Sequence, residues 1–321
     1  MGFCRTNMFK RLESSGAAFL LSVSRHILRN FVYIHALANN LPVPMGAQDA
    51  ALLDERVYDE DADDTAADLF DDSGASPKAE HSFTILKSEE EYRAKAHAVY
   101  EQYSGEYKSR FSWFRPELFI DTLAKHLLSD AQALIKIITF SGQWESKMDS
   151  KLLALKDLID ESHPNEKILI FSQFADTIRY LGQELKRMGV KSIADVTGDS
   201  ENLTHIVHRF SPRSNGRTMR PSDELRILLA TDVLSEGQNL QDCSIVVNFD
   251  LPWAIIRLIQ RVGRVDRIGQ KATTIPCYTF LPADGVERII QLRSRIRQRL
   301  KENSEVVGTD EAFFEDDKSN K

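Results

Sequence analysis

The sequence is poor in cysteine, with three residues in 321, and no two of them form a Cys-x-x-Cys pair. Cys4, Cys243 and Cys277 are therefore not spaced for a zinc site or a disulfide framework, and the composition fits a reducing, cytoplasmic setting. Long apolar runs are also missing, because no stretch approaches the roughly 20 residues of a transmembrane helix. The apolar segment 16–23 is too short for a secretory signal. We expect no membrane association.

A phosphate-binding loop of the form Gly-x-x-x-x-Gly-Lys-Ser/Thr is absent as well, because the chain contains no Gly-Lys pair. Such a loop supplies the N–H groups and the lysine that hold nucleotide phosphates. His205 and His208 stand three apart on a predicted helix, but without a cysteine or carboxylate partner, so we expect no metal site. No Gly-x-Gly-x-x-Gly turn follows a predicted strand, which argues against a Rossmann-like transferase.

The net charge of −7 is unevenly distributed along the chain. Residues 59–72 carry eight acids and no base, and residues 302–321 carry seven acids against two lysines. The rest of the chain therefore has a net charge of +6. A mildly basic body with acidic appendages is compatible with a nucleic-acid groove.

The most informative segment that is present is Gln-Arg-Val-Gly-Arg-Val-Asp-Arg-Ile-Gly-Gln at residues 260–270. Arg264 and Arg267 stand three apart, and on the helix that we predict over 254–268 they share one face. Gly263 allows the backbone to approach another group closely. Guanidinium groups presented in this way suit the charge that develops on a transferring phosphoryl group. Considered alone, one such pair would favour a solvated basic helix face.

A second phosphate-type segment lies upstream, at the spacing of a βα repeat. Residues 227–230 form a short apolar run suited to a buried parallel strand. The run ends in Thr231 and Asp232, which places polar groups at the carboxyl edge, where open α/β sheets bind their ligands. Gly237 then interrupts the pattern, and the next strand, 244–249, leads into the helix with the arginines.

These segments resemble motifs of superfamily 2 helicases. Thr231-Asp-Val-Leu-Ser-Glu-Gly-Gln-Asn-Leu-Gln241 is similar to motif V, and Gln260-x-x-Gly-Arg-x-x-Arg267 is similar to motif VI. Lys167-Ile-Leu-Ile-Phe-Ser-Gln-Phe174 resembles motif IV, and Val196-Thr-Gly-Asp-Ser200 resembles the short motif after it. Several motifs in the right order are far more specific than any one alone.

Three further segments resemble the Swi/Snf-like branch. Arg267-Ile-Gly-Gln270 and Asp250-Leu-Pro-Trp253 fit it, although Ala254-Ile255 departs from its usual Asn-Pro. Residues 7–31 resemble the helical insert between the lobes of bacterial Swi/Snf-like helicases. There Lys10 and Arg11 could touch a phosphate backbone, and a solvated helix face is the alternative.

The resemblance implies a role for individual residues of this chain. Arg264 and Arg267 would be the catalytic arginine fingers that stabilise the γ-phosphate transition state, oriented by Gln260. The further residues implied at the ATP site, near the ribose and the lobe interface, are Asp232, Glu236, Gly237 and Gly263. The residues implied to meet the nucleic-acid backbone are Ser172, Gln173, Thr197, Gly198 and Thr231.

The resemblance also implies partners and cofactors. In this family ATP lies between two RecA-like lobes, and motifs V and VI belong to the second lobe. The motifs quoted above cover the second lobe and none of the first, so the Mg²⁺ ligands are expected on a first lobe. We expect DNA as a partner, together with a first-lobe ATPase chain or an N-terminal part of the same protein. The alternative is a non-catalytic DNA- or protein-binding module that docks on a partner ATPase.

The fold class that we expect is α/β, a RecA-like parallel sheet flanked by helices and preceded by a mostly helical region with a disordered acidic linker. Asp149 is placed to cap a helix that begins the sheet region. The predicted parts are a helical inter-lobe segment 1–40, an acidic flexible linker 41–86, a helical segment 87–147, the RecA-like lobe 148–303 and an acidic disordered tail 304–321. The predicted strands are 167–172, 192–196, 226–230, 244–249 and 274–280, and the predicted helices include 9–36, 87–103, 117–140, 174–188, 201–210, 254–268 and 285–302.

Overall fold

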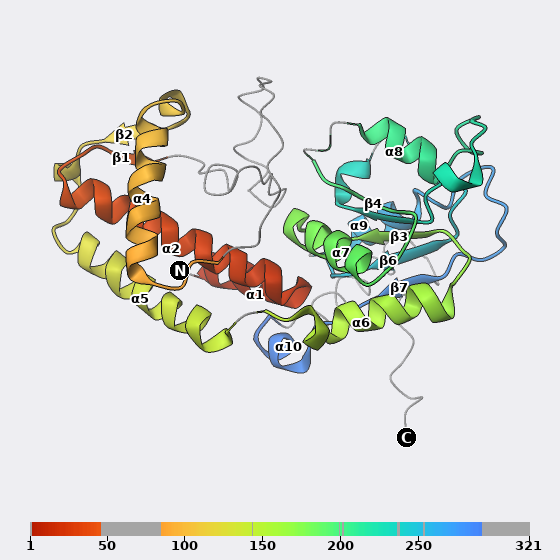
Figure 1. Ribbon diagram of the computed structural model, residues 1–321, viewed down its shortest axis with the longest axis horizontal. Helices are drawn as coiled ribbons and strands as arrows, with labels where there is room; N and C mark the ends of the chain where they lie inside the picture. The colour runs from red at the N-terminus through yellow and green to blue at the C-terminus, as the bar shows by residue number, and fades with distance from the viewer. Residues whose placement is uncertain are drawn as a thin grey trace, which may run out of the picture.

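A computed structural model describes the protein over residues 2–45, 85–142, 144–198, 200, 202–235, 238–252 and 254–290. Figure 1 shows a helical region on one side and a sheet with its covering helices on the other. We call these two parts the helical region and the α/β lobe. The predicted tail 304–321, the far end of the predicted helix 285–302 and residues 46–84 of the predicted linker lie outside the described residues.

The helical region is built around α2 (Gly16–Ala38), which packs against α4 (Glu89–Ser104) and α5 (Leu123–Ser141). Phe31 of α2 stacks on Tyr92 of α4 with ring centroids 6.0 Å apart, inside the apolar core that the three helices share. The single helix predicted over 9–36 is wrong in one respect. Ser15, with an extended backbone (φ −155°, ψ 136°), separates α2 from α1 (Gly2–Ser14).

A small antiparallel ribbon closes the far end of the helical region. β1 (Val43–Met45) pairs with β2 (Ser112–Phe114), and Val43 is buried. The first residues of the predicted linker 41–86 are therefore part of the folded region, because this ribbon supplies hydrogen-bond partners that the local sequence does not reveal. The short helices η2 (Lys108–Arg110) and η3 (Pro116–Leu118) flank β2.

The α/β lobe contains a five-stranded parallel sheet with the order β4-β5-β3-β6-β7. Its central strands are short apolar runs whose residues are all buried, as expected for a sheet that is covered on both faces. This confirms the predicted fold class. The strands are β3 (Ile168–Phe171), β4 (Ile193–Val196), β5 (Ile227–Ala230), β6 (Ile245–Asn248) and β7 (Cys277–Thr279).

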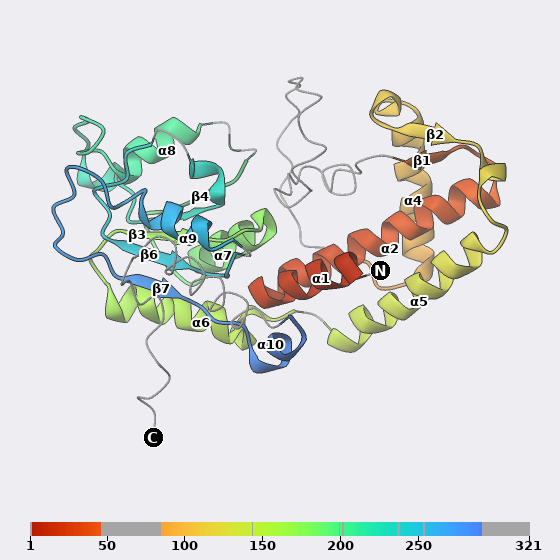
Figure 2. The same cartoon turned by 180° about the vertical axis from the view of Figure 1, so that it is seen from behind.

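Alternate strand residues enter two separate cores, one on each face of the sheet. Ile168 and Ile170 pack with α6 (Ser150–Asp157) and α7 (Ala175–Arg187), whereas Leu169 and Phe171 pack with α8 (Leu203–Phe210). Figure 2 shows α6 and α8 on opposite sides of the sheet. The remaining short elements are η4 (Ser146–Met148), η5 (Leu158–Ser162), η6 (Pro221–Asp223), η7 (Asp232–Ser235) and α10 (Asp284–Ile290).

The helix predicted over 254–268 is shorter than expected. α9 spans Ile255–Val262, and the chain then turns at Gly263. Arg264 and Arg267 therefore lie in the turns after the helix rather than on one helical face. The turn is stabilised by the backbone bond from Val265 N–H to the Val262 carbonyl (2.9 Å).

Candidate functional site

The residues predicted to meet nucleic acid gather at one edge of the sheet. Each follows the last residue of a strand, on β3, β4 or β5, and these three strands are neighbours. Because parallel strands end at the same edge, the structure brings the whole set together, where α/β sheets bind ligands. The residues at this carboxyl edge are Ser172, Gln173, Thr197, Gly198 and Thr231.

Most side chains at this edge point inward. Ser172, Gln173, Thr197 and Thr231 are all at least 94% buried, and only Gly198 is exposed. Hydrogen bonding between the strands continues past the strand ends. For example, the N–H of Ser172 donates to the Ala230 carbonyl at 3.1 Å. The backbone at this edge is therefore firmly held.

Two buried polar atoms at the edge have no hydrogen-bond partner. They are Nε2 of Gln173 and Oγ1 of Thr231, on the neighbouring strands β3 and β5. An unsatisfied buried polar group costs about 1–3 kcal/mol. Such groups are uncommon in folded proteins, and one explanation is a ligand that completes them.

The Ser172 hydroxyl, in contrast, already has partners within the protein. Its Oγ donates to Asp250 Oδ2 at 2.5 Å and accepts from the Phe174 N–H at 3.1 Å. The hydroxyl is fully buried in this arrangement. Ser172 therefore shapes the loop after β3 in the described conformation, and its contact with nucleic acid stays a prediction.

Asp232, predicted near the ribose of ATP, is held by two arginines of α9. Its carboxylate accepts hydrogen bonds from Arg261 at 2.6 and 3.0 Å and from Arg257 at 3.3 Å. Arg261 is 2% exposed, donates to Asn248 at 3.1 Å and lies over the Phe171 ring. This arginine joins α9 to the segment after β5, and the sequence analysis did not identify it. The signal that was available is its spacing of four from Arg257, which puts both on one face of α9.

The predicted arginine fingers lie directly after this braced helix. Arg267 donates to the carbonyls of Gly263 (3.2 Å) and Gln238 (3.4 Å), and Arg264 is half-buried. A Cβ at Gly263 would lie 3.3 Å from the Ile259 carbonyl oxygen, which is a tight contact. Because glycine has no Cβ, the chain can turn closely against the end of α9 at this position. Gln260 is exposed on α9.

Beside Arg267 the surface forms an open hollow of about 530 Å³, lined by Gln241, Asp266, Arg267 and Ile268. Glu236 and Gly237, the other residues predicted at the ATP site, lie outside the described residues. The geometry thus assembles Asp232, Gln260, Gly263, Arg264 and Arg267 around α9 and leaves the placement of the other two untested.

The expectation that Lys10 and Arg11 could touch a phosphate backbone is wrong for this structure. Lys10 is 1% exposed and donates to Glu13 at 2.7 Å, and the Arg11 guanidinium lies 3.5 Å from Asp176 and over the Phe174 ring. Both charges are paired with acidic side chains inside the protein, where α1 packs on the α/β lobe.

Neither a metal centre nor a membrane span is found in the part of the chain that the structure describes. No three or more histidine, cysteine or acidic side chains cluster there as metal ligands. No helix among those residues has the length and apolar character needed to cross a bilayer.

Comparison with known proteins identifies the α/β lobe. Residues 150–269 match the model of the helicase conserved C-terminal domain. The uncharacterized ATP-dependent helicase YqhH of Bacillus subtilis is 33% identical over 123 residues, which cover 38% of this chain and 20% of that protein. The ATP-dependent RNA helicase DBP8 of Candida glabrata is 30% identical over 151 residues, 46% of this chain and 31% of that protein.

The RNA polymerase-associated protein RapA of Sodalis glossinidius is 32% identical over 152 residues, 47% of this chain and 15% of that protein. The crystal structure of the C-terminal part of the Fun30 ATPase domain is similar with a TM-score of 0.39 and 18% identity, and the likeness covers 61% of this chain and 57% of that one. The chain thus spans from 15% to 31% of the length of these three curated relatives. Residues 150–269 therefore form a helicase conserved C-terminal domain, and the parallel sheet of this domain is RecA-like.

Proposed function

We propose that this chain contributes the second lobe of an ATP-dependent nucleic-acid translocase of the Swi/Snf-like branch that acts on double-stranded DNA. The observation that carries the proposal is the pair of unpaired buried groups at the carboxyl edge, Gln173 Nε2 and Thr231 Oγ1. Both can donate hydrogen bonds, and phosphate oxygens accept them. Contacts of this kind position a duplex without reading its sequence.

The arginines after α9 support the ATP part of the proposal. Arg264 and Arg267 follow a helix whose orientation is fixed by the Arg261–Asp232 pair. A fixed guanidinium stabilises the charge of a transferring phosphoryl group without reorganising during the reaction. ATP would bind between this surface and a first lobe, which would supply the lysine nest and the Mg²⁺ ligands.

The edge assignment is tested with Thr231→Val, which keeps the shape of the side chain and removes its hydroxyl. Because that hydroxyl is unsatisfied, its loss should leave the free chain as stable as before or slightly more stable. It should nevertheless weaken duplex binding, measured by fluorescence anisotropy. Thr139→Val, at an exposed position of α5, is the control. Unchanged duplex affinity in Thr231→Val would contradict the assignment.

The arginine assignment is tested by supplying a first lobe in trans and measuring ATPase activity with and without duplex. Arg264→Ala should reduce turnover by about a hundredfold or more, whereas Arg213→Ala, at an exposed arginine of the loop after α8, should not. A loss of less than about tenfold for Arg264→Ala would rule out a finger role. The chain by itself should bind ATP at millimolar strength or weaker, since exposed charge pairs contribute only about 0–1 kcal/mol each.

A non-catalytic module that docks on a partner ATPase is the second candidate. The observation that favours it is an exposed apolar group beside the arginines, where Ile256, Ile259 and Ile268 are 54%, 45% and 102% exposed. Apolar exposure of this kind marks protein contact surfaces. A stable complex with a first lobe that shows no duplex-stimulated ATPase activity would favour the module.

A further inference from the structure

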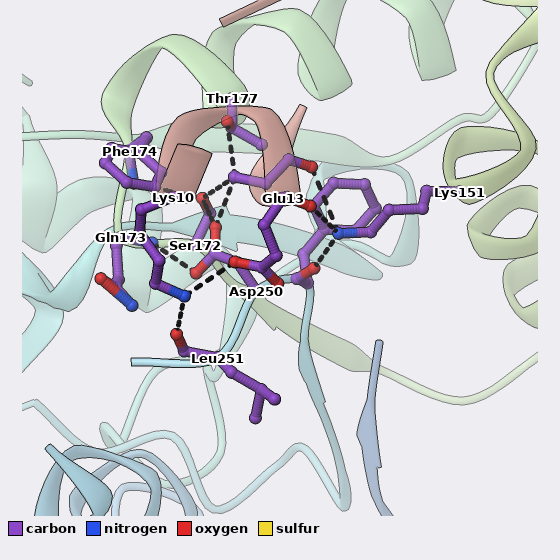
Figure 3. Close-up of polar contacts among 11 residues, drawn as sticks. Lys10, Glu13, Lys151, Ser172, Gln173, Phe174, Thr177, Asp250 and Leu251 are labelled. Atoms are coloured by element: carbon purple, nitrogen blue, oxygen red, sulfur yellow. Dashed lines mark hydrogen bonds and ion pairs between the residues drawn. The ribbon is translucent and has the colours of Figure 1, made fainter. Parts of the chain in front are cut away.

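The end of α1 is joined to the carboxyl edge of the sheet through one buried carboxylate. Asp250, two residues after β6, accepts hydrogen bonds at Oδ2 from Ser14 (2.6 Å) and Ser172 (2.5 Å). Its Oδ1 accepts from the N–H of Gln173 at 3.0 Å. Figure 3 shows Asp250 beside Ser172 and Gln173 of the loop after β3, with Lys10 and Glu13 of α1 close by. Asp250 therefore connects three segments that are remote in sequence.

Two lysines, Lys10 buried and Lys151 half-buried, complete this junction. Lys10 of α1 donates to the carbonyl of Leu251. Lys151, at the start of α6, donates to the carbonyls of Glu13 (2.8 Å), Ser14 (3.2 Å) and Phe249 (2.8 Å). The lysine thus satisfies carbonyls at the end of α1 that have no partner within their own helix.

The buried charges make the junction sensitive to the loss of any member. Burial raises the pKa of Glu13, and burial likewise lowers the pKa of Lys151. A buried charge is tolerated only while its partners remain in place. The packing of α1 on the lobe is therefore a specific arrangement rather than a general apolar contact.

The helical region also contacts the other end of the loop after β3, where α7 begins. Arg25 of α2 forms two hydrogen bonds with Asp176, at 2.6 and 3.0 Å, in the first turn of α7. Ser14 also lies within hydrogen-bond distance of Thr177 (2.8 Å). The segment 172–177 is thus held by α1 and α2 together.

We infer that Ser14 and Asp250 are positioning residues. Through their hydrogen bonds, the helical region fixes the conformation of the loop that carries Gln173. Docking of α1 and occupation of the carboxyl edge are then coupled, and the coupling is reciprocal. The loop geometry follows from the contacts above. Its effect on a bound duplex rests on the proposed function.

The test is hydrogen exchange on the full chain carrying Ser14→Ala. The matched control is Ser22→Ala, a buried serine of α2 whose hydroxyl donates to the Ala18 carbonyl of its own helix (2.8 Å). Loss of a hydrogen bond to a charged group should speed exchange at the Gln173 amide by about tenfold or more in Ser14→Ala. Strand β3 amides should not change, and Ser22→Ala should leave Gln173 unaffected.

The exchange experiment is accompanied by a conservative variant, Ser14→Thr, and by a measurement of duplex affinity. Ser14→Thr keeps the hydroxyl and should restore slow exchange at Gln173, which keeps the test valid if Ser14→Ala folds poorly. Duplex affinity should fall several-fold in Ser14→Ala and remain unchanged in Ser22→Ala.

Unchanged Gln173 exchange in Ser14→Ala, or an equal increase at every amide, would overturn the positioning role. Faster Gln173 exchange with unaltered duplex affinity would overturn the coupling. A wild-type chain that binds no duplex would instead refute the proposed function and leave the exchange result standing.

Discussion

Replacing Asp176 by alanine should destabilise the chain by about 3–5 kcal/mol, the usual cost of breaking a buried ion pair. The carboxylate is 2% exposed and bonds Arg25 at 2.6 and 3.0 Å, with Arg11 at 3.5 Å and Arg179 at 3.9 Å. Its removal leaves the nearby guanidinium groups without their shared anion. Arg25→Ala should cost less, because Arg11 and Arg179 still compensate Asp176.

The same helix offers a matched control. Arg187 and Glu184 form an ion pair of 2.5 Å near the end of α7, with the Arg187 side chain 71% exposed. Arg187→Ala should cost only about 0–1 kcal/mol, because water around the exposed guanidinium screens its pairing with Glu184, whose side chain is 12% exposed. Both pairs include a carboxylate of α7, but Asp176 pairs with a buried arginine of α2, whereas Glu184 pairs with an exposed arginine of α7 itself.

The assay is urea unfolding at neutral pH, followed by circular dichroism, with the free energy extrapolated to water. Replacing both Arg25 and Asp176 by leucine should recover most of the loss, because neither charge is then left buried alone. If Asp176→Ala and Arg187→Ala cost the same, burial does not govern the strength of these pairs, and our account of the contact between α2 and α7 is wrong.

Three further outcomes are expected. Burial alone would raise the pKa of Asp176, but Arg25, Arg11 and Arg179 hold it below its ordinary value of 3.8. The wild-type advantage over Asp176→Asn should therefore be complete above pH 3.8 and disappear as the pH falls through the lower folded pKa, measured by urea unfolding across pH. Gly16→Ala should cost about 1–3 kcal/mol, because the new Cβ would meet the Trp144 ring. Arg261→Lys should cost about 1.5–3 kcal/mol in thermal unfolding, because an ammonium group cannot make the bidentate contact with Asp232.

Gly285→Ala places its Cβ in open space at the start of α10, so it should be neutral or slightly stabilising. A Gly16→Ala variant as stable as Gly285→Ala would show that the Trp144 contact is not tight. A stability advantage over Asp176→Asn that grows on acidification would contradict the pKa direction. Wild-type stability in Arg261→Lys would show that the Asp232 pair is not needed to hold α9.

The sequence by itself determined the α/β class and the position of most strands. Apolar runs such as 168–171 and 227–230 are buried on both faces, so their pattern indicates a covered parallel sheet without further information. Asp149 was also predictable as a helix cap, and its carboxylate accepts from the N–H groups of Lys151 and Leu152 at 3.1 and 3.2 Å. Caps and strand runs depend on neighbours in sequence, which local patterns record.

Only the tertiary structure decided how the site side chains are used. Ser14 and Asp250 are 236 residues apart in the sequence and share one hydrogen bond, so no local pattern links them. Lys10 looked like a surface charge because its partners come from distant segments. The helix before Arg264 ended earlier than its apolar period suggested, since Gly263 and the turn bonds after it compete with helix continuation. Long-range polar pairing, rather than periodicity, fixes the carboxyl edge of this protein.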